Sequence, residues 1–86
     1  MESRRSDLAG RTAAILRELA NDVNTETVAR ELHRIVGTCS SYGLIDGSLG
    51  AADLLARVRD DHVIDLALDL TALADVFALS ADGREN

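Results

Sequence analysis

The chain has no proline and few aromatic residues. Its 86 residues include no proline, no tryptophan, one phenylalanine and one tyrosine. Without proline, no internal position removes a backbone N–H from a helix. Two aromatic residues are few for a small β-sandwich, because its strands favour aromatic and β-branched side chains. Alanine, leucine, arginine and glutamate are strong helix formers, so the composition favours an all-α fold.

Lysine is also absent, and acidic residues outnumber basic ones. Nine arginines face 15 aspartates and glutamates, which gives a formal net charge of −6. This balance argues against nucleic acid and against an anionic membrane surface as partners. No apolar run approaches the roughly 20 residues that cross a bilayer, and segment 1–7 is polar. We therefore expect a cytoplasmic protein.

Cysteine and length set two further limits. The single cysteine, Cys39, cannot form an intramolecular disulfide, and its apolar surroundings in the sequence predict a core position. A chain of 86 residues makes one domain, 1–86, with a core over about 7–80 and a frayed tail over 81–86. This length leaves no room for a nucleotide-binding kinase module, and no glycine-rich phosphate loop is present.

Four segments show helical periodicity and are joined by short connectors. They cover about 7–20, 26–42, 48–60 and 62–79. Short connectors make consecutive helices antiparallel, so we expect a four-helix, up-down-up-down bundle.

Capping residues and apolar stripes define these helices. The expected N-caps are Ser6 or Asp7, Thr25 and Asp61. Gly43 stands where a left-handed residue would end the second helix. The apolar face expected for the third helix consists of Leu49, Ala52, Leu55 and Val58.

The second helix has a regular apolar seam. The seam residues follow one another at intervals of 4, 3, 4 and 3, and they are Val28, Leu32, Ile35, Cys39 and Tyr42. At 100° per residue, they fall within about 40° of one direction, which we take to face the core.

His33 points away from that seam. It lies about 140° from the core direction, so its side chain is predicted to be exposed. Ala29 and Gly37 lie one turn away, and Ser40 lies two turns on. A glycine inside a helix costs about 1 kcal/mol relative to alanine, which suggests that something large approaches the backbone there. Neutral imidazole is a good nucleophile at neutral pH, so an exposed histidine among small residues would suit phosphoryl transfer.

The segment from His33 to Leu44, HRIVGTCSSYGL, resembles the signature of histidine-containing phosphotransfer (HPt) domains. That family has glycine four and ten residues after its histidine, and Gly37 and Gly43 match both positions. Leu32 and Ile35 match the apolar positions that flank the histidine. The local match covers about a third of the chain, and the bundle architecture extends it further.

The resemblance implies a fold, a phosphoacceptor and partners. His33 would carry the phosphoryl group on the exposed face of the second helix of the bundle. The partners would be receiver domains of response regulators or of hybrid histidine kinases. Those receivers would supply the aspartate, a lysine and Mg²⁺, so this chain would need no cofactor or metal of its own. It would be a stoichiometric carrier rather than an enzyme.

One position departs from the family pattern. The family usually has lysine three residues after the histidine, where this chain has Val36. That lysine neutralises the phosphoryl group. We expect Arg30, which lies three residues before His33, to take over the role of this lysine, and the adjacent Arg34 is the second candidate. Val36 would then contact the docked receiver, together with Ala29 and Ser40, while Gly37 allows its approach.

Other interpretations of these residues are weaker. No second ligand stands one turn from His33, so a metal site is not predicted, and His62 is interpreted as a surface residue. No base is positioned to activate Ser40 or Ser41 as nucleophiles. The main alternative is a non-phosphorylated module that docks and sequesters a receiver or kinase. A monomer is favoured, although alanine-rich faces on the first helix would also permit a dimer.

Overall fold

The computed structural model describes residues 2–81, and these residues form four α-helices without any strand. The helices are α1 (Glu2–Asn21), α2 (Thr25–Ser41), α3 (Ile45–Arg59) and α4 (Leu66–Ala81). The predicted all-α class and the four-helix bundle are confirmed. Of the tail expected over 81–86, Ala81 belongs to α4, and 82–86 lie outside the described residues. Within residues 2–81, no helix combines the length and apolarity needed to cross a bilayer.

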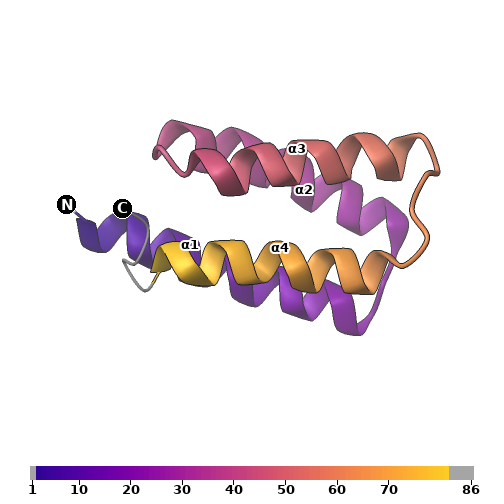
Figure 1. Cartoon of the computed structure of the whole chain (residues 1–86), viewed down its shortest axis with the longest axis horizontal. Helices are drawn as coiled ribbons and strands as arrows, with labels where there is room; N and C mark the ends of the chain where they lie inside the picture. The colour runs from indigo at the N-terminus through magenta and orange to yellow at the C-terminus, as the bar shows by residue number, and fades with distance from the viewer. Residues whose placement is uncertain (1, 82–86) are drawn as a thin grey trace.

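The helices pack as two antiparallel pairs (Figure 1). α1 lies against α4, and α2 lies against α3, whereas α1 and α2 make few direct contacts. The bundle measures 37 × 21 × 19 Å along its principal axes. Successive helices alternate in direction, so the α2–α3 turn lies at the same end of the bundle as the first turn of α1.

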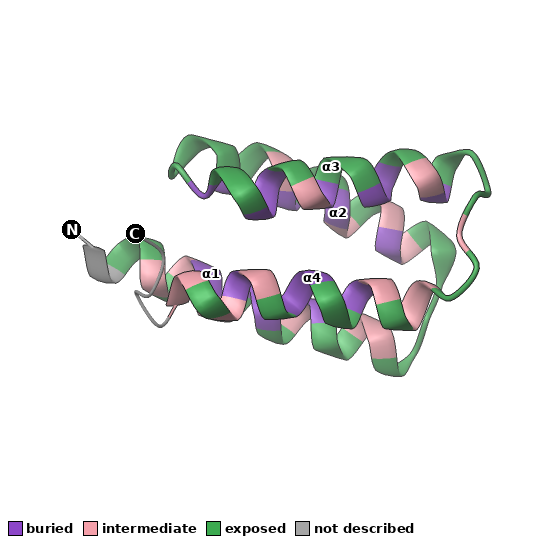
Figure 2. Ribbon diagram, viewed as in Figure 1, coloured by how far each residue is buried: buried purple, intermediate pink, exposed green. Residues whose placement is uncertain are grey.

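The core lies between the two pairs (Figure 2). Its largest fully buried side chain is Phe77 of α4, which packs against the backbone of Gly47 in α3. A Cβ atom at Gly47 would overlap the Phe77 ring, so only glycine permits this close approach. The buried hydrophobic residues are Ala9, Ala13, Leu16, Val28, Leu32, Ile35, Cys39, Leu44, Ala51, Leu54, Leu55, Val58, Leu70, Leu73, Ala74 and Phe77.

The predicted seam of α2 is confirmed for four of its five residues. These four, Val28, Leu32, Ile35 and Cys39, are buried. Tyr42 was wrongly assigned to the core, because it is the C-cap residue and its exposed fraction is 44%. The helix ends at Ser41, so Tyr42 no longer follows the helical periodicity that keeps the other seam residues in the core.

Both ends of α2 are well defined. Asn24, rather than the predicted Thr25, is the N-cap, and its side chain accepts a hydrogen bond from Thr27 N–H at 3.1 Å. At the other end, Gly43 takes the expected left-handed conformation, with φ of 79°. Leu44 N–H then donates to the Cys39 carbonyl at 3.0 Å, and Gly43 N–H donates to the Ser40 carbonyl at 3.2 Å. These two bonds form a Schellman motif.

Three predicted helix starts are wrong. α1 already begins at Glu2, so Ser6 and Asp7 lie inside it, and α3 begins at Ile45 rather than at 48. α4 begins at Leu66 instead of 62, because Asp65 Oδ1 accepts a hydrogen bond from Leu68 N–H at 3.1 Å and caps it.

Asp61 ends α3 instead of starting α4. Its φ is 58°, and His62 N–H donates to the Arg57 carbonyl at 2.8 Å. Asp61 thus occupies the left-handed position that follows a helix, which aspartate tolerates better than most residues. His62 is exposed in the α3–α4 connection, which agrees with its interpretation as a surface residue.

The buried face of α3 is rotated from the predicted one. Leu55 and Val58 are buried as expected, but Ala52 is exposed and Leu49 has an exposed fraction of 65%. The small residues Gly47, Ser48 and Ala51 take their place and let α3 approach its neighbours closely. This rotation places an apolar stripe in solvent.

Candidate functional site

His33 lies in the middle of α2 with its side chain exposed to solvent. The buried seam of α2 fixes this orientation, because His33 follows Leu32 directly and successive helical residues differ by about 100°. Within residues 2–81, the imidazole has no hydrogen-bond or ion-pair partner. The ring is therefore accessible from solvent, with neither nitrogen held by the rest of the described chain.

Gly37 lies one turn beyond His33 and leaves the helix surface bare. A Cβ atom added there would meet nothing within 4 Å, outside its own helix turn. Two glycines of α3 behave differently. A Cβ at Gly47 would overlap Phe77, and one at Gly50 would lie 2.8 Å from Leu73 Cδ1. Packing explains Gly47, and Gly50 lies against Leu73, but none of the described residues requires glycine at position 37.

Small side chains make up most of the surface around His33. Ser40 is exposed two turns further on, and Ala29 and Val36 are half-buried at the edge of the core. The Val36 carbonyl accepts a hydrogen bond from the buried Ser48 hydroxyl of α3 at 3.3 Å. The valine thus lies on the flank of α2 that faces α3, next to the small residues around His33.

The two candidate arginines, Arg30 and Arg34, differ in whether they form an ion pair. Arg34 Nη2 lies 2.9 Å from Glu31 Oε1 and forms an ion pair with it. Arg30 is exposed and makes no ion pair within the described part of the chain. Arg30 precedes His33 by three residues, a spacing that makes the two residues neighbours on the helix surface. Of the two, Arg30 is free to interact with an anion at His33.

An exposed apolar stripe on α3 borders this surface and was missed by the sequence analysis. It consists of Ile45, Leu49, Ala52 and Ala56, at intervals of 4, 3 and 4. Ile45 is 54% exposed and Leu49 is 65% exposed. The stripe lies next to α2, because Ile45 and Ala52 are one helical turn before and after Ser48, which contacts Val36.

A sequence signal for this stripe existed. Gly47 and Gly50 are three residues apart, and both allow the close approach of α4 side chains. Placing that glycine pair on the buried face would have turned Leu49 outward. The stripe and the His33 face together form one continuous surface on α2 and α3, which we call the His33 surface.

Cys39 and the carboxylates do not add a reactive centre to this surface. Burial raises the pKa of the Cys39 thiol above its ordinary value, against the opposing effect of a contact between its Sγ and Thr12 Oγ1 at 3.8 Å. The thiol is thus held neutral in the core. Among the described residues, no three His, Cys, Asp or Glu side chains converge in a way that could hold a metal ion.

Gly37 offers a test of the site that does not depend on any partner. We expect Gly37→Ala to raise the free energy of unfolding by about 0.5–1 kcal/mol, because it removes the backbone entropy of glycine from a helix interior without a clash. Urea denaturation followed by circular dichroism measures the change. Gly47→Ala is the control, and it should lose stability, because its Cβ would overlap the fully buried Phe77 ring. A loss of stability in Gly37→Ala would show that packing requires this glycine after all.

Comparison with models of known protein families, with curated proteins and with solved structures finds no match. The two features that carry most information are the exposed His33 and the open space at Gly37.

Proposed function

We propose that this chain is a phosphorelay carrier that accepts a phosphoryl group on His33 and passes it on to a receiver domain. The observation that carries the proposal is Gly37, a helix-interior glycine in open space one turn from an exposed histidine. Such a glycine lowers the stability of α2 and gains nothing inside the molecule. Its effect is to clear the helix surface beside the imidazole for a partner.

The reaction needs little from the carrier itself. A neutral ring nitrogen of His33 attacks the phosphorus of an aspartyl phosphate on the receiver, so that a P–N bond forms and the P–O bond to the aspartate breaks. The aspartate leaves as a carboxylate, and the proton on the second ring nitrogen stays there or passes to water. The reverse reaction returns the phosphoryl group to an aspartate. By the family resemblance, the receiver contributes the Mg²⁺ and lysine that neutralise phosphoryl charge.

In this proposal the carrier contributes position and docking. His33 stands on a rigid helix that is capped at both ends, which limits the conformational freedom lost on reaction. The α3 stripe supplies exposed apolar area for the receiver, and Ala29, Val36 and Ser40 extend this area across α2. A protein of this kind acts with cytoplasmic receivers, uses no nucleotide and carries one phosphoryl group per chain.

The second candidate function is a docking module that binds a receiver or kinase without accepting phosphate. The observation that favours it is Val36, which replaces the lysine usual in the family. Such a module would use the same His33 surface but would not depend on the imidazole. The two functions therefore differ in what happens when His33 is replaced.

Phosphoryl transfer to wild-type protein and to His33→Gln separates the two functions. With a phosphorylated receiver domain as donor, we expect wild type to gain one phosphoryl group and His33→Gln to gain none. Intact-mass spectrometry at neutral to alkaline pH measures this, since phosphohistidine is labile in acid. If neither protein gains mass while both bind the receiver, the docking module is the correct function. Gain of mass by both proteins would place the phosphoryl group elsewhere.

Arg30 is expected to stabilise the phosphorylated state. Arg30→Gln should shorten the lifetime of phosphohistidine and slow transfer by up to about fivefold, because one exposed charge interaction contributes at most about 1 kcal/mol. Arg34→Gln is the matched control, since Arg34 is already paired with Glu31 and its loss should change little. The measurement is the decay of the phosphorylated mass with time. Equal decay in wild type and Arg30→Gln would refute the role.

Leu49 is expected to contribute to receiver docking. Leu49→Ser should raise the receiver concentration at half-maximal transfer at least about tenfold, because fully burying a leucine contributes roughly 1.5–3 kcal/mol and about 1.4 kcal/mol is tenfold. Leu68→Ser, at a similarly exposed leucine on α4, is the control and should behave like wild type. The maximal transfer rate at saturating receiver should not change in either variant. An unchanged half-maximal concentration for Leu49→Ser would remove the α3 stripe from the docking surface.

A further inference from the structure

A second surface lies along the junction of α1 and α2, away from His33. The two helices make few direct contacts, and a groove runs between them for most of their length. Among the eleven groove residues that come from α1 and its connector, six recur at intervals of 4, 3, 4, 3 and 4 along one face of α1. They are Arg4, Leu8, Arg11, Ile15, Glu18 and Asp22. This is the spacing of a helix seam that packs against another helix.

The middle of this α1–α2 groove is apolar and incompletely covered. Leu8 and Ile15 line it, and both are only half-buried. The buried side chains of Thr12, Ile35 and Cys39 form its floor. A helix that entered the groove would therefore find an apolar centre and gain burial there.

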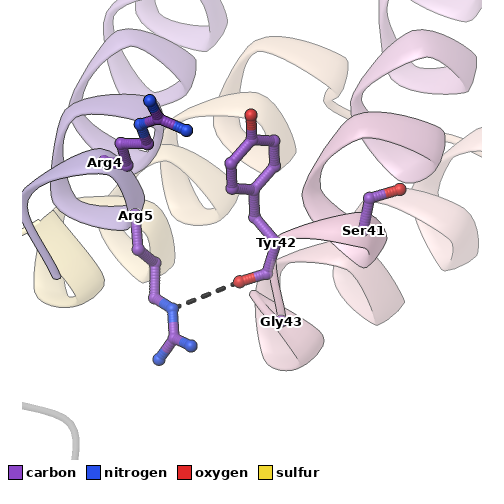
Figure 3. A pocket seen from close by; sticks show the side chains of 5 residues that line it. All are labelled: Arg4, Arg5, Ser41, Tyr42 and Gly43. Carbon is purple, nitrogen blue, oxygen red and sulfur yellow. Dashed lines mark hydrogen bonds between the residues drawn. The ribbon is translucent and has the colours of Figure 1, made fainter. Parts of the chain in front are cut away.

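One end of the groove is basic. Arg4, Arg5 and Arg11 line it together with a single carboxylate, Asp7. Figure 3 shows Arg4 and Arg5 extending from α1 beside Tyr42, with the Arg5 Nε donating to the Tyr42 carbonyl at 3.2 Å. Within the described residues, none of the three arginines has an ion-pair partner. Arg4 and Arg5 also stand in the first turn of α1, where the helix dipole disfavours positive charge.

The other end of the groove is acidic. Glu18, Asp22 and Glu31 line it together with a single arginine, Arg34, which is paired with Glu31. Three basic residues and one acidic residue at one end thus correspond to three acidic residues and one basic residue at the other. The groove is neutral as a whole, although the chain carries a net charge of −6.

A surface with this polarity is complementary to itself after a two-fold rotation, as an interface between two identical subunits requires. If two α1 helices lie antiparallel with their midpoints near residue 13, Arg4 of one copy is opposite Asp22 of the other. Arg11 then lies about 4.5 Å along the axis from Glu18 of the second copy, within reach of its side chain. Each basic end meets an acidic end, and the apolar centres meet in the middle.

We infer that the α1–α2 groove is a homodimer interface, and that its occupant is a second copy of this chain. This departs from the monomer that the sequence analysis favoured. The interface leaves the His33 surface free, because Arg34 and Thr38 line the groove while His33 and Gly37, one residue before each, lie about 100° further around α2. The inference therefore stands independently of phosphoryl transfer.

A charge-swap experiment tests this interface. Arg4→Glu with Arg11→Glu makes both ends of the groove acidic, and Glu18→Arg with Asp22→Arg makes both ends basic. By sedimentation equilibrium at low ionic strength, we expect wild type to show twice the chain mass and each double variant to show the monomer mass. An equimolar mixture of the two double variants should recover the dimer mass, because opposite charges then meet at both ends.

The control for the acidic double variant is Arg17→Glu with Arg59→Glu, which lowers the net charge by the same amount at positions outside the groove residues. It removes the exposed Arg17–Asp75 ion pair, which contributes at most about 1 kcal/mol, and should leave the dimer intact. Circular dichroism checks that every variant keeps its helices. Raising NaCl from about 50 to about 500 mM shortens the Debye length from about 14 to about 4 Å and should lower the dimer fraction of wild type. A monomeric wild type, dimers in both double variants, or a mixture that stays monomeric would each overturn the inference.

Discussion

The packing of the α2 seam determines most of what this molecule presents to its surroundings. Val28, Leu32, Ile35 and Cys39 are buried, so the rotation of α2 about its axis is fixed by the core. A shift of one residue in that rotation would turn the helix by about 100° and would carry His33 toward the core. The Asn24 cap and the Schellman turn at Gly43 fix the two ends of the helix in the same way. The exposure of His33 is thus a consequence of which residues are buried.

The helical glycines differ in whether neighbouring side chains leave room for a Cβ atom, and this difference helps to distinguish a packing requirement from a functional one. Gly47 is required by its neighbour, since a Cβ there would overlap the Phe77 ring, whereas a Cβ at Gly50 would lie 2.8 Å from Leu73 Cδ1 and would make that methyl group shift. Adding volume to such a packed site typically destabilises a protein by about 1–3 kcal/mol. Gly37 has no such neighbour, so its lower helix propensity is not offset inside the chain. Gly10 of α1 also lacks a close neighbour, since an added Cβ would meet only Ala81 Cβ at 3.9 Å, so an uncrowded glycine alone does not mark a site. At Gly37 the open space coincides with an exposed histidine one turn away, and this combination points to a requirement outside the molecule.

The sequence predicted α2 well and α3 poorly, for a physical reason. In α2 the apolar residues occupy one side and the polar residues the other, so periodicity alone determined which residues face the core. In α3, alanine, glycine and leucine occur on most sides, and several faces satisfy the same spacing. The correct face was selected by close contact between Gly47 and Phe77, which are distant in sequence. Such a contact leaves little trace in local periodicity, so Leu49 was placed in the core and the α3 stripe was missed.

Helix ends were uncertain for a related reason. Aspartate can cap a helix at its start or occupy the left-handed position after its end, and Asp61 and Asp65 lie within one connector. Composition favours both roles, and the choice depends on where α3 leaves the core. The Arg57 carbonyl accepts a hydrogen bond from His62, which assigns Asp61 to the end of α3 and leaves Asp65 to cap α4.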